Sequence, residues 1–230
     1  MAEDIEKLKF KIGYTFNNRA LLKEALTHRS YAVENNLNYD NQRLEFLGDA
    51  VLEIILTEHL FNLYPEESEG NMTKMRSALV REEALAQFSQ EMSFPDFMYL
   101  GKGESDNHGR ERNSTIADLF EAIVGAWYLD GGLETVKKFV IDLIERNYPN
   151  PKSLLIYLNP KGSLQEYAQR TYGVTPVYQV LHTTGPEHDL MYEVEVNLNG
   201  EKAIGYATSR KNAETHAAAE LLKKLNINQD

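Results

Sequence analysis

The chain of 230 residues contains no cysteine, only seven prolines and a single tryptophan. Without cysteine, neither a disulfide framework nor a thiolate metal site can form, and this composition fits a reducing compartment. The first residues are charged rather than apolar, and no later stretch has the length of a membrane span. We therefore expect a cytoplasmic protein with no signal peptide and no membrane partner.

Cations are also scarce, with 24 Lys and Arg against 35 Asp and Glu, which gives a net charge of −11. Residues 1–154 hold 17 cations against 26 acids, whereas residues 155–230 hold 7 against 9. Because binding to a phosphate backbone normally rests on an excess of Lys and Arg, this balance argues against a nucleic-acid partner unless cations cluster locally.

The spacing of apolar residues divides the chain into two parts. From about Ile5 to Tyr148 they recur every three or four residues, with turns expected near glycines and prolines such as Gly70, which predicts an all-α domain. After Pro160 one helix is followed by alternating runs such as "MYEVEVNL", a hairpin signal at Asn199-Gly200 and a last helix capped by Ser209.

These patterns predict an all-α domain over residues 1–150, a proline-rich linker over residues 151–158 and a small α+β domain, in the order α-β-β-β-α, over residues 159–228.

The stretch "RLEFLGDAVLEIIL" carries three carboxylates in an otherwise apolar segment. In a helix, Glu45, Asp49 and Glu53 fall at positions i, i+4 and i+8 and form one narrow line. An ordinary amphipathic helix with a solvated acidic face would give the same pattern. We expect Glu53 to lie towards solvent.

A second segment, "STIADLFEAIVGAWYLDGG", repeats this arrangement with Asp118 and Glu121. Asp118 could instead form a capping box with Thr115, but this alternative does not explain Glu121. If the two stripes face each other, each like-charge pair at ~5 Å costs about 3 kcal/mol at an effective dielectric of ~20. Such a cluster requires cations or protons, and an all-oxygen ligand set suits Mg²⁺ or Mn²⁺.

The segment "NQRLEFLGDAVL" (residues 41–52) resembles the signature of the ribonuclease III family. The segments "ALTHRSY", "EGNMTKMRSALV" and "DLFEAIVGAWYLDGG" follow the order of that family's other motifs. The resemblance covers residues from about Phe10 to Leu133. It implies a Mg²⁺-dependent endonuclease that cuts both strands of double-stranded RNA and leaves 5′-phosphate and 3′-hydroxyl ends, with ribosomal precursors and other structured transcripts as substrates.

The resemblance also implies roles for particular residues. Glu45, Asp49, Asp118 and Glu121 would bind the metal, and Asp49 and Glu121 would be the catalytic residues that the reaction tolerates losing least. Glu69 matches an acid at the outer rim of the cleft. Gln42 departs from the pattern, since many relatives carry Glu there.

Family members work as homodimers, and Phe46 matches an aromatic residue that is inserted into the partner subunit. A core position of Phe46 in its own subunit is the alternative. We expect Lys74 and Arg76 to lie on a solvated helix face, with contact to phosphate as the alternative.

The second domain resembles the double-stranded-RNA-binding domain over about residues 159–225. The matching pieces are "SLQEYAQ", "PVYQV", "GPEH" and "SRKNAETHAAAELL". By this resemblance, Gln165, Glu166 and His188 would contact minor grooves of the RNA.

Arg210 and Lys211 fall in the first turn of the predicted last helix. Cations there oppose the helix dipole by about 0.3–1 kcal/mol each. A helix N-terminus is nevertheless a natural phosphate site, and two cations complete it. Two solubilising charges are the alternative. Many such domains carry a further Lys where this chain has Glu214, so we expect weak, salt-sensitive binding by this domain alone.

Two other functions remain possible from the sequence: a catalytically silent protein that binds duplex RNA, and a metal-dependent hydrolase of small phosphate esters. A silent relative should have lost one of the four inner carboxylates, and all four are present. A hydrolase of small esters would not need the second domain.

Overall fold

The structure, a computed structural model, describes residue 8 and residues 11–186 and 190–227. The chain forms two compact units, Met1–Pro149 and Asn150–Asp230, each of which is described by itself. Within the described ranges, no helix is both long and apolar enough to cross a membrane.

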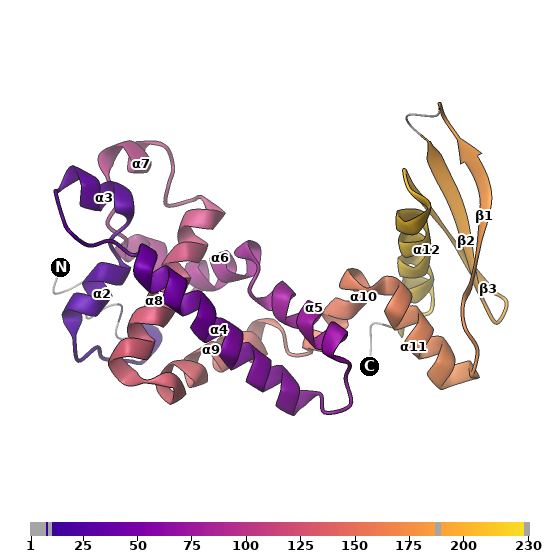
Figure 1. Cartoon of the computed structure of the whole chain (residues 1–230), viewed down its shortest axis with the longest axis horizontal. Coiled ribbons are helices and arrows are strands. Elements are labelled where there is room, and N and C mark those ends of the chain that lie inside the picture. Colours follow the sequence, from indigo (N-terminus) through magenta and orange to yellow (C-terminus); the bar gives the residue numbers. More distant parts are fainter. Residues whose placement is uncertain (1–7, 9–10, 187–189, 228–230) are drawn as a thin grey trace. The chain divides into compact units, whose positions relative to one another are not determined.

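The described part of the first unit is helical, apart from an isolated bridge between Thr27 and Tyr99, which confirms the predicted all-α domain (Figure 1). Its elements are α2 (Arg19–Ala25), α3 (Arg29–Glu34), α4 (Gln42–Leu63), α5 (Glu69–Leu79), α6 (Glu82–Glu91), the 3₁₀ helix η1 (Phe94–Phe97), α7 (Lys102–Asp106), α8 (Asn113–Gly131) and α9 (Leu133–Asn147).

Helix α8 forms the centre of this unit. Eleven of its 19 residues are buried, including every position from Ala122 to Trp127. Helices α2, α4, α6 and α9 all pack against it, and Figure 1 shows α4 crossing it. Because α8 begins at Asn113 with Arg112 as its N-cap, Thr115 lies inside the helix. The alternative that Thr115 and Asp118 form a capping box is therefore wrong.

The C-terminal end of α8 holds the segment that precedes α2. The carboxylate of Asp130 accepts hydrogen bonds from the Tyr14 hydroxyl at 2.6 Å and from the backbone N–H groups of Asn17 and Asn18 at 2.8 and 2.7 Å. Burial, and then the hydrogen bond and the charge of Asp130, raise the pKa of Tyr14 to about 12. These contacts fix α2 against the helix that carries Asp118 and Glu121.

The second unit is the predicted α+β domain. Its elements are η2 (Pro151–Leu154), α10 (Leu155–Leu158), α11 (Pro160–Tyr172), β1 (Val177–Thr184), β2 (Met191–Leu198), β3 (Glu201–Ala207) and α12 (Arg210–Lys224). The three strands form an antiparallel sheet in the order β1-β2-β3. Val194, Val196 and Leu198 alternate on the buried face of β2, as their spacing predicts.

Two local signals in this unit act as expected. Asn199 and Gly200 both have positive φ, 51° and 92°, in the tight turn between β2 and β3. Ser209 caps α12 by accepting a hydrogen bond from the backbone N–H of Asn212 at 3.2 Å. Helix α12 packs on β3 and β2 and buries Leu221 and Leu222 in the domain core.

Residues 151–158, predicted as a linker, are helical. Pro151 and Pro160 each occupy the first turn of a helical element, where a missing N–H costs no hydrogen bond, so they begin helices rather than separate them. Ile156 of α10 joins the core cluster of the second unit together with Leu164.

Candidate active site

Two glycines allow α4 and α8 to approach until their backbones touch. A Cβ atom added to Gly48 would lie 1.9 Å from the carbonyl oxygen of Glu121, and one added to Gly125 would lie 2.2 Å from that of Leu44. Neither position therefore accepts a side chain without moving a helix. This contact brings the acidic residues of α4 and α8 to one place.

Three of the four predicted carboxylates meet there. One carboxylate oxygen from each of Glu45, Asp118 and Glu121 lies within 4.8 Å of the others, and all three side chains are partly buried. Asp49 lies one turn beyond Glu45 on α4 and is exposed, and it does not belong to this group of three. Its charge nevertheless acts on Glu121.

The cluster holds more negative charge than its surroundings balance. Burial, and then the negative charges of Asp49, Asp118 and Glu45, together raise the pKa of Glu121 to about 8. The pKa of Glu45 is raised by burial and then by Asp118, Asp40 and Asp49. A group of carboxylates in this state is completed by protons or by a hard divalent cation.

Residues that the sequence prediction did not select also act on the cluster. The pKa of Asp118 is raised first by burial and then by the charge of Glu82, while His28 acts in the opposite direction. His28 lies in the quoted segment "ALTHRSY", but its place beside Asp118 depends on the packing of separate helices. Gln42 accepts a hydrogen bond from Nη1 of Arg29 at 3.1 Å.

Two further acids singled out from the sequence, Glu69 and Glu53, also lie outside the group of Glu45, Asp118 and Glu121. Glu69 lies in the first turn of α5, is exposed and accepts a hydrogen bond from the Thr73 hydroxyl at 2.9 Å. Glu53, which was predicted to lie towards solvent, is partly exposed, and its carboxylate lies 2.8 Å from Nε of Arg76. Of the two cations expected on a solvated helix face, Lys74 is exposed, whereas Arg76 is only partly exposed and pairs with Glu53.

Phe46 is 82% exposed, which contradicts the alternative of a core position within its own subunit. It borders a hollow of about 660 Å³ between α2, α4 and α8. Apolar side chains make up much of the lining, among them Leu21, Leu47 and Leu129. An exposed aromatic residue beside an apolar hollow is a surface of the kind that subunits bury on association.

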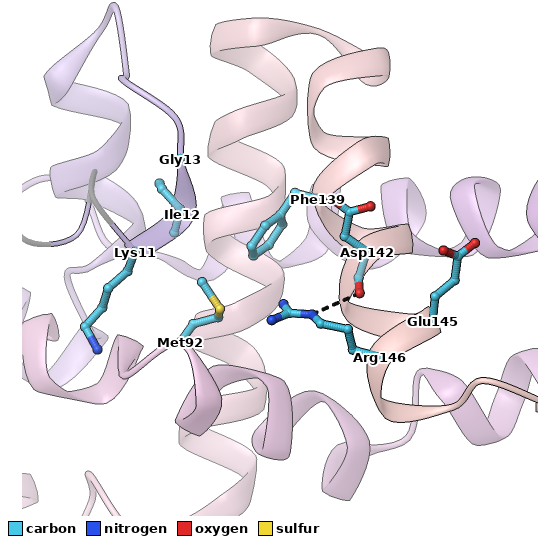
Figure 2. A pocket seen from close by; sticks show the side chains of 8 residues that line it. All are labelled: Lys11, Ile12, Gly13, Met92, Phe139, Asp142, Glu145 and Arg146. Atoms are coloured by element: carbon cyan, nitrogen blue, oxygen red, sulfur yellow. Dashed lines mark hydrogen bonds between the residues drawn. The ribbon is translucent and has the colours of Figure 1, made fainter.

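A further hollow of about 580 Å³ lies elsewhere on the first unit (Figure 2). Figure 2 shows that Lys11 and Ile12, Met92 after α6 and residues of α9 contribute its side chains, with the backbone of Gly13 beside them. Nε of Arg146 donates to the backbone carbonyl of Asp142 at 3.2 Å within it. None of the four predicted metal ligands lines this hollow.

In the second unit, Arg210 and Lys211 are the first two residues of α12, as predicted, and both are exposed. Gln165 and Glu166 are exposed on α11, and Glu166 borders a hollow that is also lined by Tyr167. His188 lies outside the described residues.

Glu214 has two cationic neighbours that were not predicted from the sequence. Nζ of Lys161 donates to one carboxylate oxygen at 2.5 Å, and Nε of Arg210 donates to the other at 2.9 Å. The spacing of Arg210 and Glu214 on one helix could have indicated their pairing, but nothing local indicates Lys161.

Comparison with known proteins agrees with this geometry. Residues 18–147 match the family model described as Ribonuclease-III-like, and residues 160–225 match the model described as Double-stranded RNA binding motif. The fold and the acidic cluster thus define a two-domain protein with a nuclease domain followed by an RNA-binding domain.

Similar proteins include the Ribonuclease 3 of Campylobacter fetus, 42% identical over 98% of this chain and 100% of that protein. The Ribonuclease 3 of Bacillus cereus is 46% identical over 94% of this chain and 89% of its own length. A solved nuclease domain of ribonuclease III from Campylobacter jejuni matches with a TM-score of 0.60 and 41% identity, covering 63% of this chain and 99% of that domain. The chain belongs to the ribonuclease III family of endoribonucleases that act on double-stranded RNA.

Proposed function

We propose that this chain is a Mg²⁺-dependent endoribonuclease that cuts double-stranded RNA and leaves 5′-phosphate and 3′-hydroxyl ends. The observation that carries the proposal is the approach of the Glu45, Asp118 and Glu121 carboxylates to within 4.8 Å of one another. Family membership and the RNA-binding motif support the substrate class.

The residues present fit a hard divalent ion. The ligand set contains only carboxylate oxygens, and the charges that act on Glu121 are all negative. Glu45, Asp49, Asp118 and Glu121 would hold Mg²⁺, and Mn²⁺ would be able to replace it because it prefers the same ligands. When bound, the ion would offset phosphate charge. It would also lower the pKa of a water molecule, so that the water can lose a proton and attack the phosphodiester at neutral pH.

The chain's own residues then have distinct tasks. Glu121 is partly buried, whereas Asp49, whose charge acts on Glu121, is exposed to solvent. We propose these two as the catalytic residues and Glu69 as an outer acid at the rim of the cleft. The attacking water forms the new P–O bond, the bond from phosphorus to the 3′ oxygen breaks, and that oxygen takes up a proton.

The second unit would hold the duplex. Arg210 and Lys211, at the N-terminus of α12, are proposed to contact phosphates, and Gln165, Glu166 and His188 to contact minor grooves. Ribosomal RNA precursors and other structured transcripts are the proposed substrates, and the cytoplasm is the proposed compartment.

The decisive test of catalysis is incubation with a long RNA duplex, with Mg²⁺ or with chelator. We expect cleavage only with Mg²⁺, and none by the Glu121→Ala variant. Glu53→Ala is the matched control, since it removes an acid of α4 that is paired with Arg76 outside the cluster. Cleavage in chelator, or at an equal rate by Glu121→Ala, would refute the metal mechanism. Tight binding without cleavage in Mg²⁺ would indicate a silent RNA-binding protein.

We further propose that the active form is a homodimer in which Phe46 enters the partner. The exposure of Phe46 and the apolar hollow beside it support this proposal. The solved domain from Campylobacter jejuni is itself described as having a region involved in dimer formation.

Sedimentation of the Phe46→Glu variant tests the dimer. We expect this variant to be monomeric, because a charge would have to be buried in an apolar contact. Phe61→Glu is the control, since Phe61 is 65% exposed on the same helix and does not line the hollow. A monomeric wild type, or a dimeric Phe46→Glu variant, would contradict the assignment.

A further inference from the structure

Glu214 is the acid that stands where related RNA-binding domains often carry a cation. Its side chain is only 13% exposed, although it lies in the second turn of α12, next to the proposed phosphate site. A carboxylate at this place would be expected to repel RNA. The contacts of Glu214 indicate a different role.

Both oxygens of Glu214 are occupied. Lys161, at the start of α11, donates to Oε2 at 2.5 Å, and Arg210 donates to Oε1 at 2.9 Å. Burial alone would raise the pKa of Glu214, but the hydrogen bonds from Lys161 and Arg210 outweigh it and hold that pKa below its usual value. The carboxylate is therefore ionised at neutral pH and fully engaged within the domain.

Lys161 is itself held in place by a third element. Its ammonium group lies 4.8 Å from the centre of the Tyr178 ring on β1, in a cation–π contact. The group formed by Lys161, Tyr178 and Glu214 thus connects α11, β1 and α12. Because Lys161 holds the Glu214 side chain in place, the hydrogen bond from Arg210 to Glu214 restricts the position of the Arg210 guanidinium group.

Arg210 contacts Glu214 through the inner nitrogen of its guanidinium group. The two terminal nitrogens, with four N–H donors, are not used in this hydrogen bond. The Arg210 side chain remains 64% exposed, so its outer edge faces solvent. A planar guanidinium group held through Nε can bind a phosphate with its two terminal nitrogens.

We propose that Glu214 is a positioning residue for RNA binding: it holds the guanidinium of Arg210 so that the terminal nitrogens meet a phosphate of the duplex. This inference rests on the proposed role of the α12 N-terminus. Lys161 balances the charge of Glu214, which leaves the charge of Arg210 available to the RNA. Ordering a long side chain on binding is unfavourable, and Glu214 reduces this penalty by ordering Arg210 in advance.

The direction in which Glu214→Ala changes the affinity for RNA distinguishes a positioning role from simple repulsion. If Glu214 only repelled RNA, Glu214→Ala would tighten binding, because the variant has one negative charge fewer. If Glu214 positions Arg210, the same variant binds more weakly. We expect an increase in Kd of about 3- to 10-fold, the effect of ordering one flexible side chain.

The test measures the Kd of the full chain for a short RNA duplex in chelator, so that binding is separated from cleavage. Glu220→Ala is the matched control, since Glu220 is on the same helix and pairs with Lys223 at 2.6 Å, away from Arg210. It makes the same change in net charge, and we expect unchanged or slightly tighter binding. Glu214→Gln, which keeps one acceptor oxygen, should recover part of the affinity.

A double-mutant comparison excludes a purely structural role. In the Arg210→Ala background, Glu214→Ala should cause no further loss, because the side chain that it positions is absent. Equal losses in both backgrounds, or tighter binding by Glu214→Ala alone, would overturn the inference. If Arg210→Ala binds duplex RNA as well as wild type, the proposed role of the α12 N-terminus fails instead.

Discussion

Glu121 in the first unit and Glu214 in the second are partly buried acids on helices, yet their pKa values shift in opposite directions. Around Glu121 the neighbouring charges are those of Asp49, Asp118 and Glu45, and the pKa rises to about 8. Around Glu214 they are those of Lys161 and Arg210, and the pKa falls. The first acid belongs to a group whose negative charge protons or an external cation would balance, whereas the second is already balanced by Lys161 and Arg210.

This contrast predicts that one substitution has opposite effects at the two positions. Glu121→Gln should reduce cleavage on the order of 10³-fold, because it removes several kcal/mol of metal-dependent stabilisation. The same variant should melt at a higher temperature than wild type in chelator at pH 8, because a neutral amide removes repulsion. Glu214→Gln should melt at a lower temperature. Cleavage assays measure the first effect and thermal denaturation the second. A shift of the melting temperature in the same direction for both variants would contradict the comparison.

The affinity for Mg²⁺ should depend strongly on pH. A metal ion must displace the proton that Glu121 retains up to about pH 8. For the loss of one proton, the affinity should rise by up to roughly 50-fold between pH 6 and pH 8. Calorimetric titration with Mg²⁺ measures this, and the Glu121→Gln variant should lack most of the dependence. A flat profile in wild type would contradict the raised pKa.

In the metal-free protein the same group makes stability fall as pH rises. The pKa of Glu121 in the folded state lies above its ordinary value of 4.5, so the folded chain binds more protons than the unfolded chain between pH 4.5 and about pH 8. The contribution of this group to the free energy of unfolding therefore decreases across that interval. Added Mg²⁺ should offset the decrease.

The approach of the two acidic helices should be sensitive to a single methyl group. Gly125→Ala places a Cβ atom 2.2 Å from the carbonyl oxygen of Leu44, so we expect a loss of about 1–3 kcal/mol in the free energy of unfolding. Gly103→Ala in α7 is the control, because a Cβ there meets no atom within 4 Å. Chemical denaturation measures both variants. An unchanged stability of Gly125→Ala would show that α4 and α8 can separate freely.

The smallest effect is expected for the balanced acid. Lys161→Met should lower the free energy of unfolding of the second unit by about 1 kcal/mol at pH 7, because the pair is partly exposed to solvent. Because the pKa of Glu214 is lowered in the folded state, its contribution is present above the unfolded pKa of 4.5 and is lost as pH falls through the folded value. The difference between wild type and variant should therefore shrink towards acidic pH, as thermal denaturation at several pH values would show.

Local patterns predicted much of the fold and the identity of the acids. Helical spacing placed Glu45 and Asp49 on one line, and the Asn199-Gly200 turn and the Ser209 cap each depend on a few neighbouring residues. The prediction of a turn near Gly70 was wrong, since Gly70 is the second residue of helix α5, which has Ser68 as its N-cap. There a strong capping residue outweighs the weak helix propensity of glycine.

Features that depend on distant segments could not be predicted in this way. The contact of Gly48 with the backbone of Glu121 joins residues more than 70 positions apart, and it decides how closely the carboxylates approach. The pair of Lys161 and Glu214 joins residues 53 positions apart. In both cases the residue types are visible in the sequence, but their proximity follows only from the packing of whole elements.

The helical segment before α11 determines where the second unit can be cut out of the chain. A fragment that starts at residue 159, where the sequence pattern changes, would lack Ile156, which belongs to the core of this unit. It would also lack Leu155, which is 3% exposed and lines the hollow beside Tyr167. An expression fragment intended to fold by itself should therefore begin at Asn150, so that both side chains continue to shield the domain from water.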